Sequence, residues 1–142
     1  MRVRRTRRVA APPERVWEVV SDPYALPRWW PRTQRVESVS AAGWTSVLGT
    51  DRGRSLRADW QVVTSEPPAR RRWAQDLDGS PFAKLFTAHE VELRIAPREG
   101  GSEVSLEVDQ ALRGWARLAP FLVRGGARRQ ADAALRGLAE LF

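Results

Sequence analysis

The sequence lacks cysteine and has only one histidine, one lysine and one tyrosine among its 142 residues. Without cysteine the chain forms no disulfide, binds no metal through thiolates and has no cysteine nucleophile. The single histidine, His89, leaves carboxylates to complete any metal site, but Glu90 and Glu92 fall on the opposite face of the predicted strand. No Ser-His-Asp arrangement or glycine-rich phosphate loop is present. We therefore expect no metal and no cofactor.

Long apolar runs are also absent, and no stretch approaches the length needed to span a bilayer. The basic N-terminus is followed by Ala11-Pro12-Pro13 rather than by the apolar core of a secretion signal. We therefore expect a cytoplasmic protein with no membrane insertion. The chain has the length of one domain and shows no repeat or linker, so we predict a single domain over residues 1–142, as a monomer or homodimer.

Positive charge is abundant, with a formal net charge of +7, which is typical of nucleic-acid-binding proteins. The arginines are nevertheless dispersed: they occur at the N-terminus, at Arg70-Arg71-Arg72 and along residues 117–136. No recognised nucleic-acid-binding motif accompanies them. The sequence therefore disfavours nucleic acid as a partner. A ribosome- or nucleic-acid-associated role stays an alternative that rests on charge alone.

Proline and glycine divide the chain into segments. A strand is predicted over residues 2–10, and a short helix follows from Pro13 to Val20 because proline is tolerated in a first turn. A second short helix begins after Asp22, a capping residue, and reaches Trp29-Trp30. From residue 32 to residue 112, five or six alternating apolar runs are separated by turn residues, which predicts strands. Turns are expected at residues 43, 51–53, 66–69, 77–81 and 97–101.

The final segment, residues 115–142, has apolar residues at helical spacing and predicts one long helix. Gly125-Gly126 lies inside it at a cost of about 1 kcal/mol per residue, which suggests close approach of the sheet or a ligand. Short connections make the sheet antiparallel, and the terminal helix must cover its apolar face. The pattern therefore predicts an α+β fold with six to seven strands, two short helices and a long C-terminal helix.

Residues 10–31, AAPPERVWEVVSDPYALPRWWP, resemble the N-terminal signature of the SRPBCC (START-like) superfamily, in particular its polyketide cyclase/dehydrase and lipid-transport branch. The similarity continues through Trp60-Gln61-Val62, Pro67-Pro68 and Arg72-Trp73. It implies the helix-grip fold, in which a curved sheet wraps round the C-terminal helix. It also implies a deep cavity between the two for a lipid, polyketide or other small hydrophobic or aromatic molecule.

Strand alternation predicts which side chains face this cavity. The apolar set Val104, Leu106 and Val108 also turns Gln110 inward, and the apolar set of the preceding strand turns Thr87 and His89 inward. The loop over residues 79–86, with Phe82 at its tip, is expected to act as a lid. Trp30 and Phe121 are expected to close the cavity from the helices. The predicted ligand-binding residues are Trp30, Trp60, Trp73, Gln75, His89, Gln110 and Phe121.

These residues also have a structural interpretation. Tryptophans often pack cores, Gln75 and Gln110 can hydrogen-bond each other, and a lone inward histidine is often a satisfied core residue. The leading hypothesis is a protein that binds a small hydrophobic molecule. The alternative is a polyketide cyclase or aromatase in which His89 is the catalytic acid/base and a glutamine polarises a carbonyl. For that chemistry Arg71, at a strand end, is the only candidate inward arginine.

Overall fold

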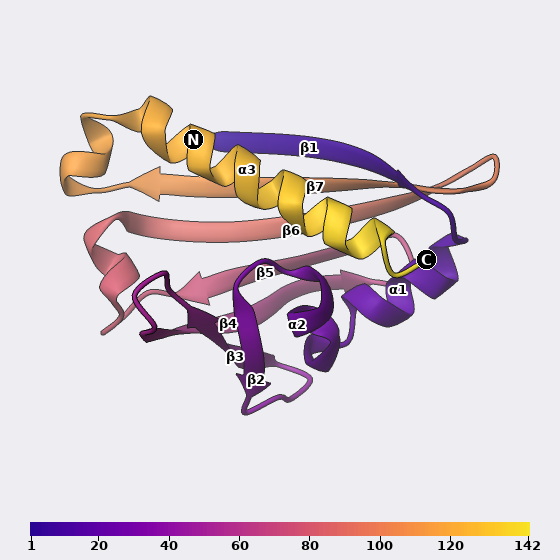
Figure 1. The fold of residues 1–142 in the computed structure, drawn as a ribbon, viewed down its shortest axis with the longest axis horizontal. Helices are drawn as coiled ribbons and strands as arrows, with labels where there is room; N and C mark the ends of the chain where they lie inside the picture. Colours follow the sequence, from indigo (N-terminus) through magenta and orange to yellow (C-terminus); the bar gives the residue numbers. More distant parts are fainter.

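The computed structural model describes residues 1–142 and confirms the predicted α+β class (Figure 1). Its seven strands and three α-helices are joined by short turns and three 3-10 helices. In chain order the elements are β1 (Arg2–Val9), α1 (Pro13–Val20), η1 (Pro23–Ala25), α2 (Leu26–Trp29), β2 (Thr33–Glu37), β3 (Gly43–Gly49), β4 (Ser55–Glu66), β5 (Arg70–Asp76), η2 (Pro81–Lys84), β6 (Phe86–Arg98), β7 (Gly101–Leu112), η3 (Gly114–Arg117) and α3 (Pro120–Ala139).

The seven strands form one antiparallel sheet in the order β1-β7-β6-β5-β4-β3-β2. Every neighbouring pair from β2 to β7 is consecutive along the chain, and β1 is added at the edge beside β7. Helix α3 crosses one face of this curved sheet and packs against β1, β7 and α2 (Figure 1). This is the helix-grip arrangement that the resemblance implied.

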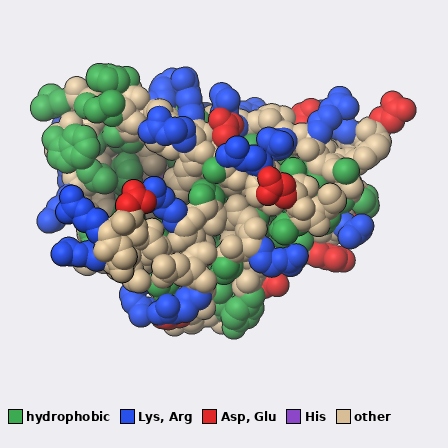
Figure 2. All heavy atoms as spheres, viewed as in Figure 1, with side chains coloured by type: hydrophobic (Ala, Val, Ile, Leu, Met, Phe, Trp, Pro, Cys, Tyr) green, Lys and Arg blue, Asp and Glu red, His purple; other side chains and the backbone are tan.

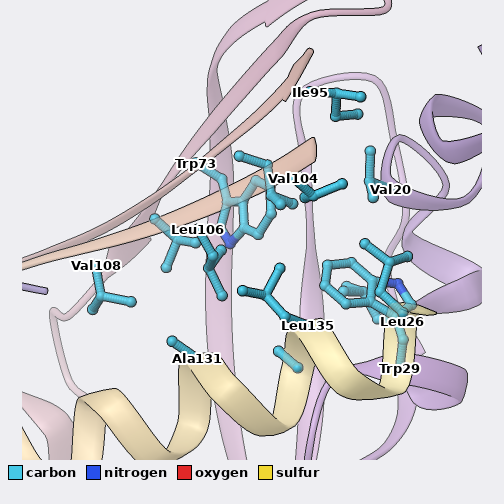
Figure 3. Close-up of a cluster of buried hydrophobic side chains, with 14 of the residues drawn as sticks. Val20, Leu26, Trp29, Trp73, Ile95, Val104, Leu106, Val108, Ala131 and Leu135 are labelled. Atoms are coloured by element: carbon cyan, nitrogen blue, oxygen red, sulfur yellow. The ribbon is translucent and has the colours of Figure 1, made fainter. Parts of the chain in front are cut away.

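The core lies between α3, the short helices and the middle of the sheet. Figure 3 shows Leu135 of α3 beside Leu26 and Trp29, with Leu106 and Trp73 on the sheet side. Their burial is nearly complete. Along β6 and β7 the predicted inward apolar residues, Val91, Leu93, Ile95, Val104, Leu106 and Val108, are likewise buried. None of the helices is long and apolar enough to cross a membrane.

The outer face of the sheet holds a ladder of ion pairs that accounts for several arginines. Glu92 accepts hydrogen bonds from Arg70 Nε at 2.7 Å and from Arg94 Nε at 2.8 Å. Burial raises the pKa of Glu92, but these hydrogen bonds and charges outweigh it and hold the pKa below its usual value. Beside them Arg72 Nη2 donates to Asp109 at 3.0 Å. Part of the positive charge is therefore neutralised within the protein.

The structure differs from the sequence-based prediction at Gly43, at Pro120 and at Gly125-Gly126. Gly43 begins β3 instead of forming a turn, and glycine is required there because a Cβ would collide with the carbonyl of Trp60. The predicted long helix is divided into η3 and α3, since Pro120 opens a new helix. The expected close approach at Gly125-Gly126 is wrong: a Cβ at Gly125 would have Arg129, 3.5 Å away, as its nearest neighbour. The close approach occurs instead at Gly137, against the backbone of Trp29.

Candidate functional site

A cavity of about 210 Å³ lies between the inner face of β3–β7 and the elements that cover it. Helices α2 and α3 and the 3-10 helix η2 contribute side chains to its wall, and none of the lining residues carries a formal charge at neutral pH. The lining residues are Leu26, Trp30, Trp44, Ser46, Leu48, Ala58, Trp60, Trp73, Gln75, Phe82, Leu85, Phe86, His89, Gln110 and Gln130.

Four tryptophans form the aromatic part of the wall. Trp44 and Trp60 face each other across β3 and β4 and stack with their ring centroids 6.5 Å apart. Trp73 meets Trp44 edge-on at 5.8 Å and Trp30 at 6.2 Å. The Trp44 indole nitrogen donates to Ser46 Oγ at 3.0 Å, so its polar atom is already satisfied. The Trp44 ring therefore offers flat apolar surface rather than a hydrogen-bonding group to the cavity.

A chain of three polar side chains crosses the sheet at the cavity wall. Gln75 on β5, His89 on β6 and Gln110 on β7 point to the same face, and His89 pairs directly with Gln110 across the strands. His89 Nδ1 lies 2.8 Å from Gln75 Oε1, and its Nε2 lies 3.5 Å from Gln110 Nε2. Because a carbonyl oxygen only accepts hydrogen bonds, Nδ1 carries the hydrogen, and the lone pair of the unprotonated Nε2 accepts from Gln110 Nε2.

The imidazole of His89 is neutral at physiological pH. Burial lowers the pKa of His89 from its ordinary value of 6.5 to about 4. No carboxylate lines the cavity to stabilise an imidazolium, and the ring packs between Trp60 and Phe86 at centroid distances of 5.2 Å and 5.3 Å. The cavity is thus electrically neutral, with His89 as a hydrogen-bonding group and not as a charge.

Two amide atoms of this polar chain are buried without a partner: Gln75 Nε2, a donor, and Gln110 Oε1, an acceptor. A buried amide group without a hydrogen bond costs about 1–3 kcal/mol, so each of these two atoms lacks a partner that a bound group could supply. If the side-chain amides of Gln75 and Gln110 are both flipped and the hydrogen of His89 lies on Nε2, the hydrogen bonds between the three side chains run in the opposite direction. One donor and one acceptor still remain unpaired, so the pattern does not depend on the tautomer.

The structure brings six of the seven predicted ligand-binding residues together at the cavity: Trp30, Trp60, Trp73, Gln75, His89 and Gln110. It does not bring Phe121 there. This residue lies in the first turn of α3 and is 71% exposed. The predicted closure of the cavity by Phe121 is therefore wrong. The sequence could not show that α3 begins beyond the part of the sheet that it covers.

Two further assignments change. A register shift between Phe86 and Ala88 moves Phe86 into the buried position on β6 and leaves Thr87 exposed, contrary to the parity argument. Phe82 is not at an exposed tip: it lies in η2, packs against the core and lines the cavity. Arg71 does point inward and is buried, but its Nη1 donates to Ser65 and the residue does not line the cavity.

The sequence argument also assigned no inward-facing residues to β3. Trp44, Ser46 and Leu48 all line the cavity, and their alternate spacing within Gly43–Gly49 was the signal that could have identified them. Gly43 had been assigned to a turn, so the strand that starts there was not assigned an inward face. No comparable signal identifies Leu85, which follows the 3-10 helix η2, or Gln130, which lies in α3, because neither position belongs to a strand with alternating inward and outward residues.

Comparison with known proteins places this geometry in a family. The sequence matches the family described as polyketide cyclase / dehydrase and lipid transport over residues 1–142. A search of the curated proteins gives no significant match. Among solved structures, the di-domain ARO/CYC BexL from the BE-7585A biosynthetic pathway aligns with a TM-score of 0.80 and 18% identity. That alignment covers 99% of this chain and 49% of BexL.

Two shorter proteins share the fold along nearly their whole length. One, from Thermus thermophilus, has a TM-score of 0.77 and 22% identity, with 99% of this chain and 95% of that chain covered. The other, from Chromobacterium violaceum, has a TM-score of 0.76 and 19% identity over the same shares of the two chains. These likenesses show a common fold. Because the family match spans every residue, the chain belongs to the polyketide cyclase/dehydrase and lipid transport family of the SRPBCC superfamily.

Proposed function

We propose that the protein binds a small, uncharged, mainly aromatic molecule that carries one hydrogen-bond donor and one acceptor. The observation that carries this proposal is the unpaired donor on Gln75 and acceptor on Gln110, on either side of His89 in a mainly apolar cavity. A carbonyl oxygen on the ligand would accept from Gln75 Nε2. A hydroxyl on the ligand would donate to Gln110 Oε1, which would satisfy both amides.

The size of the cavity supports a small ligand. An engineered apolar cavity of about 150 Å³ is known to hold benzene, so about 210 Å³ suits a molecule of roughly one or two rings. The neutral wall supports the absence of charge on the ligand, because a buried carboxylate or ammonium without a partner is strongly disfavoured. The tryptophan faces would contribute affinity by stacking, and the polar chain would contribute orientation.

The proposal is tested with three naphthalene probes: naphthalene itself, a hydroxyacetonaphthone with its hydroxyl and ketone on different rings, and naphthoate. Quenching of tryptophan fluorescence reports binding. We expect the hydroxy-ketone to bind about thirtyfold more tightly than naphthalene, because each of the two satisfied amides contributes about 1 kcal/mol, and we expect naphthoate to bind least. Equal affinities for all three probes would contradict the proposed donor–acceptor pair.

A variant that fills the cavity tests whether the ligand binds there. Ala58 lines the cavity from β4, and Ala58→Leu should weaken binding of the hydroxy-ketone at least tenfold by occupying the space. Gln61→Leu adds an apolar side chain to the exposed outer face of the same strand and should leave the affinity unchanged. If both variants bind like the parent, the ligand does not occupy this cavity.

A second candidate is catalysis of ring closure in a short poly-β-ketone, favoured by the family match and by the unprotonated Nε2 of His89. In this reaction Nε2 takes a proton from a carbon between two carbonyls. That carbon attacks another carbonyl, and the proton is returned to the resulting oxygen. A pKa of about 4 predicts a rate that is flat at neutral pH and falls only as the pH approaches that value. His89→Gln should abolish turnover but retain binding; an unchanged rate would exclude His89 as the base.

A further inference from the structure

An exposed apolar patch lies at one end of the molecule, outside the cavity. It consists of Trp115, Leu118, Phe121 and Leu122, which we call the η3–α3 patch. Leu118 is 85% exposed and Phe121 is 71% exposed. Figure 2 shows hydrophobic side chains gathered at this end, over η3 and the start of α3, with Lys and Arg side chains nearby. Clustered exposed apolar side chains of this size usually mark an interaction surface.

The chain segment that carries the patch has charges of a single sign. Residues 110–131 contain no aspartate or glutamate but five arginines: Arg113, Arg117, Arg124, Arg128 and Arg129. All five are exposed, and none of them forms an ion pair with a carboxylate. They differ in this from the arginines on the outer face of the sheet, which are paired with Glu92 and Asp109. The surface is therefore complementary to an anionic one.

The shape of the patch limits what can cover it. None of its four residues lines a cavity or cleft, so the side chains project from the surface instead of forming a groove. A fluid bilayer surface accepts projecting tryptophan, phenylalanine and leucine side chains without a matching pocket. A second copy of the chain would bring the same unpaired arginines face to face, which is repulsive.

We propose that the η3–α3 patch docks the protein on the surface of a membrane that contains anionic lipids. The apolar side chains enter the headgroup–acyl boundary, and Arg117 and Arg124 contact lipid phosphates. None of the helices is long and apolar enough to span the bilayer. These four side chains would nevertheless enter its surface region, in contrast to the sequence-based expectation of no membrane insertion.

The patch is joined to the cavity by hydrogen bonds. Arg113, at the start of η3, donates from its backbone to the Leu85 carbonyl at 2.7 Å and from Nη1 to the Ala83 carbonyl at 3.2 Å. Phe82 and Leu85 of this same segment line the cavity. Docking therefore brings the η2 side of the cavity close to the bilayer, from which an apolar ligand is obtained. The docking itself does not rest on the proposed ligand, since vesicles alone are sufficient to test it.

The experiment measures co-sedimentation with phosphatidylcholine vesicles, either pure or with roughly 30 mol% phosphatidylglycerol. The parent protein should bind the anionic vesicles, bind pure phosphatidylcholine about tenfold less and lose affinity at high salt. Leu118→Asp/Phe121→Asp should reduce binding at least tenfold. Its control, Tyr24→Asp/Val63→Asp, replaces two other exposed apolar residues and should bind like the parent.

Charge is tested with a second pair of variants. Arg117→Glu/Arg124→Glu should reduce binding to anionic vesicles about tenfold, whereas Arg7→Glu/Arg8→Glu makes the same change in net charge on β1 and should have a small effect. Three results would overturn the proposal. The first is parental binding by Leu118→Asp/Phe121→Asp, and the second is no vesicle binding by the parent. The third is a parental dimer that this double variant converts to monomers, which would show that a second copy covers the patch.

Discussion

When the pH falls from about 7.5 to about 5, the parent protein should lose about 2 kcal/mol more folding free energy than a His89→Gln variant. The prediction follows from the site itself. Burial among Trp60, Phe86 and the two glutamines holds the pKa of His89 at about 4, and its ordinary value is 6.5. Urea unfolding at the two pH values, with both proteins, measures the difference.

The direction of the effect follows from proton binding in the two states. The unfolded chain protonates His89 as the pH falls below about 6.5, whereas the folded protein resists protonation until about pH 4. The stability that depends on neutral His89 is therefore complete above pH 6.5 and is lost progressively between these two values. The carboxylates with lowered pKa, Glu37, Glu92 and Asp109, lose their contributions at lower pH and do so equally in both proteins.

Ligand binding provides the control for this result. A neutral ligand that satisfies the two amides should raise the stability of the parent at both pH values, by mass action. It should not remove the pH dependence, because the imidazole stays buried. Identical pH dependence in the parent and in His89→Gln would show that His89 is protonated normally in the folded state, and hence that water reaches its ring.

Strand parity made most of the site predictable. Along β5, β6 and β7 the apolar residues Trp73, Val91, Val104 and Leu106 determine the inward face, and the polar residues at the same parity then have to share it. This local regularity placed Gln75, His89 and Gln110 on one face from sequence alone. The fold class followed from the same alternation, together with one terminal helix large enough to cover the sheet.

The failures occur where local regularity stops. The register shift at Phe86 turns Phe86 inward and Thr87 outward, contrary to the parity prediction, and no residue type in that segment marks such a bulge. Phe121 has the spacing of a core residue in a helix, yet Ala127 is the first residue of α3 that the structure buries. How far a helix extends beyond the sheet is decided by tertiary packing, which the periodicity of its residues does not contain.

The effect of the glycines in α3 also depends on tertiary packing that the sequence pattern does not contain, and it gives the second prediction of large effect. Gly137→Ala should destabilise the protein by about 1–3 kcal/mol, although alanine is a better helix former than glycine. A Cβ at Gly137 would lie 2.6 Å from the carbonyl oxygen and 3.1 Å from the Cα of Trp29. Both are backbone atoms and cannot rotate away, so α3 would have to move from α2. Thermal and urea unfolding measure the loss.

Gly126→Ala is the matched control, because it makes the same change in the same helix. A Cβ there would have only Arg129, 3.9 Å away, as a neighbour, so the helix propensity of alanine should stabilise the protein by about 1 kcal/mol. The two variants are thus expected to change stability in opposite directions. Since α2 and the adjoining Trp30 form one wall of the cavity, Gly137→Ala should also weaken binding of the hydroxy-ketone, and Gly126→Ala should not. If both substitutions stabilise the protein, α3 does not pack on Trp29 as closely as the structure indicates.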